Sequence, residues 1–193
     1  MEQRTDRPTV EQLDREIRRR KRSLQTHRIV RSTLYSLLTV AAAAVLVSTL
    51  FFPALKIFGN SMVPTLHEGE IVVCRKNSGF QTGDVVAFYY NNKILVKRVI
   101  CGPGDWFTMK EDGTVIINGS VIDEPYVTEN GFGPCDLTLP FQVPDGQYFV
   151  MGDQRASSVD SRMSQVGCVT QEQIVGQIIL CIWPLENFGW IEK

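Results

Sequence analysis

The pattern of apolar and polar residues divides the chain into three parts. A polar segment, residues 1–31, precedes 21 consecutive uncharged residues at 32–52, which read STLYSLLTVAAAAVLVSTLFF. A membrane-spanning helix needs about 20 such residues at a rise of about 1.5 Å each. Through residues 53–193 the apolar residues instead form short runs separated by turn-forming residues. The pattern therefore predicts a polar tail, one transmembrane helix and a β-rich domain.

The short apolar runs in the third part predict β-strands. Asn118-Gly119, between two apolar runs, is typical of a two-residue hairpin turn. Short helices are predicted around 62–67 and 170–175, and residues 128–146 are predicted to form a long exposed connection. The frequent short strands predict a mostly β fold, an antiparallel sheet folded on itself. The predicted strands lie at 70–75, 84–90, 93–101, 106–110, 114–118, 147–151 and 173–183.

The apolar segment could be a cleaved signal peptide or a permanent anchor. A signal peptide has a shorter apolar core, followed by small residues at a cleavage site. Here the run is long and ends in Phe51-Phe52-Pro53, so we expect an anchor. Residues 1–31 carry ten Lys or Arg and five Asp or Glu, against ten and sixteen in the rest of the chain. Basic residues concentrate on the cytoplasmic side of a membrane span. We therefore expect a protein that crosses the cell membrane once, with its N-terminus in the cytoplasm and its following domain extracytoplasmic.

Charge and cysteine content narrow the range of functions. The basic tail could be a helix lying on an anionic bilayer or a solvated, disordered tail, and the sequence leaves both open. The rest of the chain has no basic stripe, which argues against a nucleic-acid partner. The five cysteines form no CxxC pair and no His lies at metal-ligand spacing, so we predict no metal and no cofactor. We interpret most of these cysteines as small buried hydrophobic residues.

A serine follows the predicted span closely, at Ser61 within GNSMVPTL (residues 59–66). Pro64 fixes its own φ and disfavours a helical conformation at Val63, which stiffens the chain behind the serine. This suits a nucleophile that must be held in place, and it equally suits an ordinary loop leaving a membrane. A serine nucleophile also needs a nearby base, because its hydroxyl is weak at its ordinary pKa.

Three residues are considered as that base. His27 precedes the predicted span and would lie on the opposite side of the membrane, and His67 reads as a loop residue. Lys97 lies in a predicted strand whose residues on the same face are apolar, whereas Arg98 points to the other face and is expected to stay in water. Burial would lower the lysine pKa and allow a neutral amine. The alternative is an edge lysine whose amine reaches water.

A third polar cluster follows a predicted strand, in GDQRASSVDSR (residues 152–162). Two Asp, two Arg and three Ser fall within ten residues. The cluster could be a surface loop with Asx and Ser turns, or a small buried ion-pair network. A hydroxyl within it could orient a neutral lysine.

Together these segments resemble the bacterial type I signal peptidases, in their short, Gram-positive-like form. These are membrane-anchored Ser–Lys endopeptidases of protein secretion. The resemblance covers the apolar segment and essentially the whole domain after it. It rests on four motifs in order: NSMVPTL at 60–66, GDVV at 83–86, VKRVICGPGD at 96–105 and GDQRASSVDSR at 152–162.

The resemblance implies a role for each site residue. Ser61 would be the nucleophile, Lys97 the general base and Ser158 the hydroxyl that orients the lysine amine. The backbone N–H of Ser61 would form part of the oxyanion hole. Met62 would line a pocket for the small residue before the cleaved bond. Asp160 and Arg162 would form a supporting ion pair. Gly152 and Asp153 would shape the floor of the site near the lysine.

Two positions depart from the family pattern. Some relatives carry a serine two positions before the nucleophile, and its hydroxyl completes the oxyanion hole. Here that position is Gly59, which leaves the second oxyanion donor open. Gln154 stands where Asn is more usual.

The predicted function is a serine endopeptidase that removes signal peptides from exported preproteins. Cleavage would occur at small-x-small sites through an acyl-enzyme, so preproteins and the lipid bilayer are the expected partners. A self-cleaving repressor-like protein also pairs Ser with Lys, but it would be expected to carry a DNA-binding domain. An inactive membrane-anchored β module that binds exported peptides is another alternative. The sequence does not distinguish a general signal peptidase from one specialised for a single pilin or surface protein.

Overall fold

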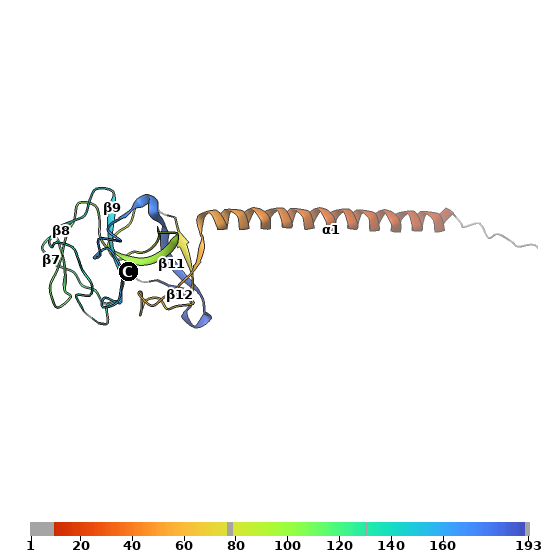
Figure 1. Cartoon of the computed structure of the whole chain (residues 1–193). Helices are drawn as coiled ribbons and strands as arrows, with labels where there is room; N and C mark the ends of the chain where they lie inside the picture. The colour runs from red at the N-terminus through yellow and green to blue at the C-terminus, as the bar shows by residue number, and fades with distance from the viewer. Residues whose placement is uncertain (1–9, 77–78, 130, 192–193) are drawn as a thin grey trace, which may run out of the picture. The chain divides into compact units, whose positions relative to one another are not determined.

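The computed structural model describes residues 10–76, 79–129 and 131–191. The chain forms two compact units, residues 1–48 and residues 49–193, and each is described here by itself. The first contains most of one long helix, α1 (Val10–Phe51). The second contains the strands and two short 3-10 helices, η1 (Gln171–Gln173) and η2 (Leu185–Asn187) (Figure 1).

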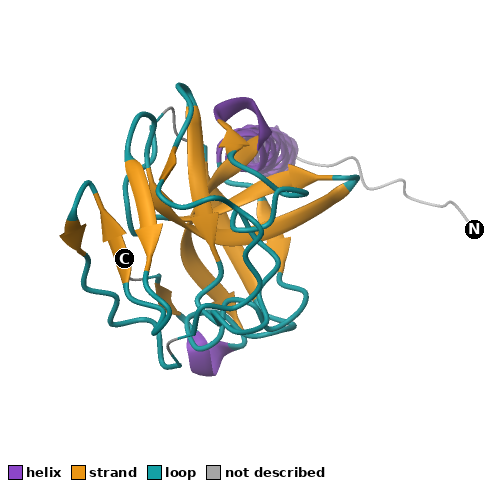
Figure 2. Cartoon of the chain, turned by 60° about the vertical axis from the view of Figure 1, so that its left-hand side comes forward, coloured by secondary structure: helices purple, strands orange, loops and turns teal. Residues whose placement is uncertain are grey.

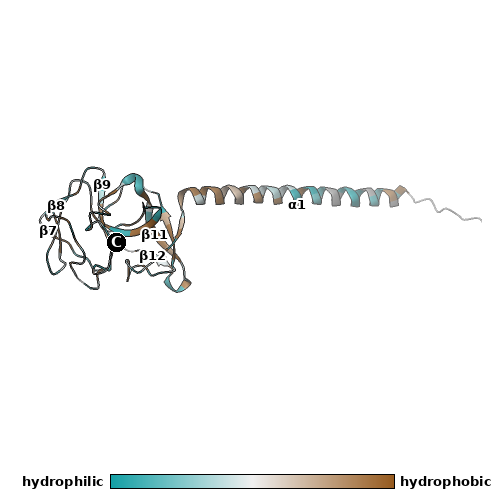
Figure 3. Ribbon diagram, in the orientation of Figure 1, coloured by the Kyte–Doolittle hydropathy of each residue, from teal (hydrophilic) through white to brown (hydrophobic). Residues whose placement is uncertain are grey.

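Helix α1 contains nearly all of the predicted span. Its Leu13–Phe51 stretch includes a window long and apolar enough to cross a membrane, by length and composition. Brown, apolar colour dominates the end of α1 that leads into the second unit (Figure 3). The helix also extends back through the basic segment to Val10, so the structure favours the helical alternative for residues 10–31. Residues 1–9 lie outside the described part of the chain.

The second unit is built from antiparallel strands that curl over one another rather than forming one flat layer (Figure 2). The larger sheet has the order β1-β2-β11-β3-β4-β9-β10, and β12 also pairs with β11. The smaller sheet has the order β7-β6-β5-β8. The strands of the larger sheet are β1 (Ala54–Lys56), β2 (Ile71–Arg75), β3 (Val85–Tyr90), β4 (Lys93–Cys101), β9 (Gln147–Met151), β10 (Val169–Thr170), β11 (Ile174–Trp183) and β12 (Gly189–Trp190). Those of the smaller sheet are β5 (Trp106–Met109), β6 (Val115–Ile117), β7 (Ser120–Val121) and β8 (Phe141–Gln142).

Two tight turns set the register of the hairpins. Asn118 and Gly119 join β6 to β7 with φ of 52° and 83°, as the sequence predicted for a two-residue turn. Asn91 and Asn92 join β3 to β4 with φ of 43° and 60°. A left-handed conformation at both central positions matches the twist of the flanking strands. The β3–β4 turn places Lys97 opposite Val86 in the ladder.

Two sequence predictions about local structure are wrong, and a third is confirmed only in part. Residues 62–67 form turns rather than a helix, because Pro64 disfavours the helical conformation at Val63 before it. The helix predicted at 170–175 shrinks to η1, after which the chain enters β11. The 128–146 connection contains β8, and several of its apolar side chains pack on the core instead of lying exposed.

Three apolar clusters form the core of the second unit. One lies around Met62, Leu66 and Val72, a second between β4, β5 and β9, and a third around Phe88 and Val150. Three of the five cysteines are buried, as interpreted from the sequence, and all five are unpaired: Cys74, Cys101 and Cys181 buried, Cys135 and Cys168 half-buried. Burial raises the pKa of the Cys74 and Cys101 thiols to about 12, which makes them poor nucleophiles.

Candidate active site

The structure brings together the predicted nucleophile, the predicted base and the hydroxyl predicted to orient that base. The Lys97 Nζ atom lies 2.7 Å from the Ser61 Oγ atom and 3.0 Å from the Ser158 Oγ atom. Ser61 comes from the turn after β1, Lys97 from the middle of β4 and Ser158 from the loop after β9. A lysine amine held between two hydroxyls has the geometry required of a base that activates one of them.

Burial prepares Lys97 for this chemistry. Only 3% of the residue is exposed, and this desolvation lowers the pKa of its amine to about 8. The nearby carboxylates of Asp160 and Asp153 act in the opposite direction, because they stabilise the ammonium form. The guanidinium of Arg162 lowers the pKa further. A substantial fraction of the amine is therefore neutral close to physiological pH.

Gly152 allows the loop after β9 to lie directly against the serine. A Cβ atom at this position would lie 2.3 Å from the Ser158 Oγ atom and 2.6 Å from the Ser61 carbonyl oxygen. The same carbonyl accepts a hydrogen bond of 3.1 Å from the Gln154 N–H. Residues 152–154 therefore fix the backbone of Ser61 and the side chain of Ser158 together.

Asp160 and Arg162 form a fully buried ion pair beneath Ser158. The Arg162 Nη2 atom lies 2.8 Å from Asp160 Oδ2, and the Arg162 Nε atom donates to Asp160 Oδ1 over 2.9 Å. Burial alone would raise the Asp160 pKa, but hydrogen bonds and charge from Arg162 outweigh it and leave the pKa below its ordinary value. Asp160 also accepts a hydrogen bond of 3.1 Å from the Gly152 N–H. The sequence left two alternatives for residues 152–162, a surface loop or a buried ion-pair network. The structure shows the buried ion-pair network.

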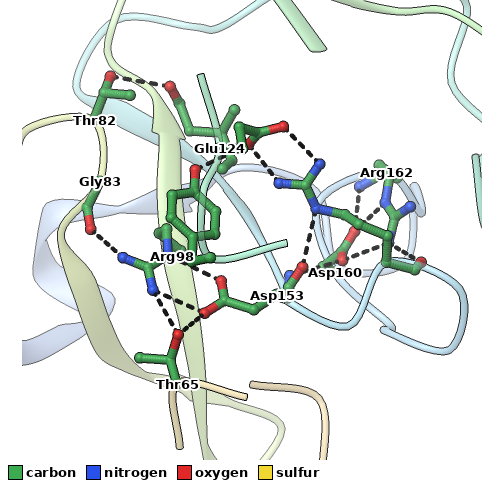
Figure 4. A network of polar contacts seen from close by, with 12 residues as sticks. Thr65, Thr82, Gly83, Arg98, Glu124, Asp153, Asp160 and Arg162 are labelled. Carbon is green, nitrogen blue, oxygen red and sulfur yellow. Dashed lines mark hydrogen bonds and ion pairs between the residues drawn. The ribbon is translucent and has the colours of Figure 1, made fainter. Parts of the chain in front are cut away.

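A second buried ion pair corrects the prediction for Arg98. This residue was expected in water, but it is 1% exposed and donates both Nε and Nη2 to the Asp153 carboxylate, over 2.9 and 2.8 Å (Figure 4). It also donates to the Gly83 carbonyl over 2.8 Å and to the Thr65 hydroxyl over 3.0 Å. The loops carrying these partners cover the second face of β4 at this point, so the Arg98 guanidinium is shielded from water.

An apolar groove of about 800 Å³ leads to Ser61 and Lys97. Residues 54–59 and residues 92–97 make up most of its lining. Met62 is also part of the lining and is 2% exposed. Gly59, with φ of +80°, lies in the lining as well and has no side chain to offer as a hydrogen-bond donor.

The two strands that line this groove, β1 and β4, each have an edge that is not paired within the described sheet. β9 pairs with β4 only from Arg98 onward, so Lys93–Val96 is paired along one edge, to β3. β1 is the first strand in the sheet order and pairs with β2. An extended peptide between β1 and β4 would find backbone donors and acceptors on both sides.

Both histidines of the chain are exposed residues. His67 has a side chain 55% exposed, and its Nδ1 atom lies 3.7 Å from the Glu70 carboxylate. His27 is an exposed residue of α1. Within the described ranges, no group of three or more His, Cys, Asp or Glu residues could hold a metal ion.

Comparison with known proteins identifies the family of this chain. Residues 30–183 match the family model described as signal peptidase, peptidase S26. The chain is 36% identical over 163 residues to signal peptidase I of Bacillus amyloliquefaciens, covering 79% of this chain and 87% of the relative. It is 39% identical over 152 residues to signal peptidase IB of Staphylococcus aureus, covering 68% of this chain and 78% of the relative. The chain therefore belongs to the signal peptidase family, peptidase S26.

A solved structure is also similar. The crystal structure of a signal peptidase I from Enterococcus faecalis V583 is 32% identical, with a TM-score of 0.45. The match covers 52% of this chain and 97% of that one.

Proposed function

We propose that this chain is a signal peptidase that cleaves signal peptides from exported preproteins, with Ser61 as nucleophile and Lys97 as general base. One observation carries the assignment of roles. A buried amine with a pKa lowered to about 8 lies 2.7 Å from a serine hydroxyl at the end of an apolar groove. Family membership supports the reaction, and the geometry supports the residues.

The first half of the reaction forms an ester. Neutral Lys97 takes the proton of the Ser61 hydroxyl as its Oγ atom attacks the scissile carbonyl carbon. The negative charge that develops on the carbonyl oxygen is stabilised by the backbone N–H of Ser61. The Lys97 ammonium then returns the proton to the leaving amine of the mature protein. The signal peptide is left bound through its terminal carbonyl to Ser61.

The second half regenerates the enzyme. Neutral Lys97 takes a proton from water, and the resulting hydroxide attacks the ester carbon. The acid form of the signal peptide leaves, and the proton returns to the Ser61 Oγ atom. Ser158, 3.0 Å from the amine, keeps the Lys97 nitrogen directed at its partner through both halves.

The groove supports an extended substrate with small side chains. The peptide would add as a strand between β1 and the free edge of β4, beside Ser61. Met62 is part of the lining and packs in the core as well, so the groove wall is backed by tightly packed side chains. A small-x-small sequence before the cleaved bond fits such a wall.

The membrane arrangement follows from the same proposal. Residues 32–52 would span the bilayer, with residues 1–31 in the cytoplasm and residues 53–193 as the extracytoplasmic catalytic domain. The excess of basic residues before the span supports this orientation. An anchored enzyme would meet its preprotein in the same membrane, which reduces the entropy lost on encounter.

Cleavage of a preprotein with an A-x-A site by the detergent-solubilised protein tests the proposed function. The native protein is expected to cut after the second alanine, and Ser61→Ala to leave the preprotein intact while still binding it. The product masses identify the bond. Thr114→Ala, which removes a hydroxyl directly before β6, is a control expected to keep native activity. Binding without cleavage by the native protein would instead favour the inactive β module.

A further inference from the structure

Two side chains from the connection after β7 reach into the network around the active site. The carboxylate of Glu124 accepts hydrogen bonds from both terminal nitrogens of Arg155, one of them over 2.9 Å (Figure 4). The Tyr126 hydroxyl donates to the same carboxylate over 2.9 Å. The Glu124 side chain is 9% exposed and that of Arg155 is fully buried, so this ion pair is shielded from solvent.

These contacts continue to the loop that lies against the nucleophile. Arg155 donates from its Nε atom to the Gly152 carbonyl over 3.2 Å. The Tyr126 ring lies under the Arg98 guanidinium, with 3.8 Å between the guanidinium carbon and the ring centroid. Arg98 in turn holds Asp153 through two hydrogen bonds.

Gly152 is contacted by Arg155 and Asp153 by Arg98. Because Gly152 and Asp153 are consecutive, these contacts form a closed ring that includes the peptide unit between them. We call this set the Glu124 ring; its members are Glu124, Arg155, Gly152, Asp153, Arg98 and Tyr126. The peptide unit it encloses belongs to the turn that packs on Ser158 and, through the Gln154 N–H, holds the Ser61 carbonyl.

We propose that Glu124 is a positioning residue for the Ser61–Lys97 pair. Its carboxylate fixes Arg155 and Tyr126, and these hold the 152–154 turn that sets the places of Ser61 and Ser158. The inference rests on the proposed function. It adds to the site a residue from the connection after β7, a strand of the smaller sheet.

A specific consequence follows for Lys97. Burial lowers the pKa of its amine to about 8, while Asp160 and Asp153 favour the charged form and Arg162 disfavours it. A looser 152–154 turn would admit water beside Lys97, and the desolvation that lowers its pKa would decrease. The Lys97 pKa would then rise toward its ordinary value, and the Ser61 hydroxyl would be held less well for attack.

Glu124→Gln tests the proposal, because it keeps the size of the side chain but removes its charge and one acceptor oxygen. Glu129→Gln is a matched control, removing the charge of an exposed carboxylate in the same connection. Both variants are compared as full-length protein in detergent, by kcat and KM and by NMR titration of labelled lysine side chains. The Lys97 resonance is assigned by its absence from Lys97→Ala.

We expect Glu124→Gln to lower kcat about 10- to 100-fold, with KM changed less than kcat. We also expect it to raise the Lys97 pKa by about half a pH unit or more. Glu124→Asp, which restores the charge, should recover part of both effects. Glu129→Gln should match the native protein in both measurements.

The proposal is overturned if Glu124→Gln matches Glu129→Gln, or if its activity falls only with the folded fraction while the Lys97 pKa stays unchanged. If Glu124→Gln does not fold, Tyr126→Phe decides, since it keeps the ring on Arg98 and removes one hydrogen bond to Glu124. A smaller change in the same direction supports the ring, and native behaviour overturns it. The NMR titration needs no substrate. It therefore decides on the ring even if the native protein cleaves no preprotein and the proposed function fails.

Discussion

Lys97→Ala is expected to reduce preprotein cleavage by about 10² to 10⁴-fold or more, because the Ser61 hydroxyl would lose its proposed base. In the structure, the Lys97 amine is the group that contacts both active-site hydroxyls, at 2.7 and 3.0 Å. The measurement is the initial rate of signal-peptide release at saturating and at low preprotein concentration. Both kcat and kcat/KM should fall, since the proton transfer stabilises the transition state more than the bound substrate.

The matched control for this experiment is Lys110→Ala. Lys110 is an exposed residue directly after β5, in the smaller sheet, so its replacement removes the same charge elsewhere. Its cleavage rate should stay within about twofold of the native rate. Substantial cleavage by Lys97→Ala would assign Lys97 a packing role and direct the search for a base to His67.

Gly152→Ala is expected to disable the site by adding a single carbon atom. The new Cβ would lie 2.3 Å from the Ser158 Oγ atom and 2.6 Å from the Ser61 carbonyl oxygen, so the turn, the serine or both must move. A displacement of about 1 Å at a reacting group can lower the rate about 10²-fold. Overpacking of this kind also costs about 1–3 kcal/mol of stability. Cleavage rates and chemical denaturation measure the two effects separately.

Gly189→Ala is the control for the glycine experiment. A Cβ at Gly189 would meet no atom within 4 Å, and this residue lies in the short strand β12. Its rate and stability should both remain close to native. If Gly152→Ala also keeps native activity, the close packing of the 152–154 turn on Ser61 is not required for catalysis.

Three arginines in the site are among the largest fully buried side chains: Arg98, Arg155 and Arg162. Each is compensated by a carboxylate within hydrogen-bonding distance. Removing one partner of such a pair leaves an uncompensated buried charge, which costs about 3–5 kcal/mol. The network therefore restricts the loops around Ser61 to the arrangement in which all three charges are paired.

Much of the larger sheet was predictable from local pattern. β4 and β9 have the predicted bounds, because their apolar runs end at clear turn residues. Placing Lys97 on an apolar face was likewise a matter of strand alternation, since side chains two residues apart share a face. The strands β1, β8, β10 and β12 were not predicted, because runs of two or three residues carry no measurable alternation.

The polar network was harder to predict. Alternation along β4 assigned Arg98 to the face opposite Lys97 but could not show that distant loops cover that face. The partners of Arg98 lie 15 to 55 positions away in sequence. Glu124 gave no local signal either, since Arg155 is 31 positions away. These contacts depend on how the two sheets pack, which short-range pattern does not specify.

The pH dependence of kcat/KM for preprotein cleavage tests the Ser61–Lys97 assignment most directly. Only the neutral amine can accept the Ser61 proton, so the rate should rise with pH as Lys97 loses its proton. With a pKa lowered to about 8, the rise should be centred near pH 8 in a series from about pH 6 to about pH 10. The residual rate of Lys97→Ala should lack this rise. A native profile that is flat across this range, or a rise near pH 8 that persists in Lys97→Ala, would contradict the assignment.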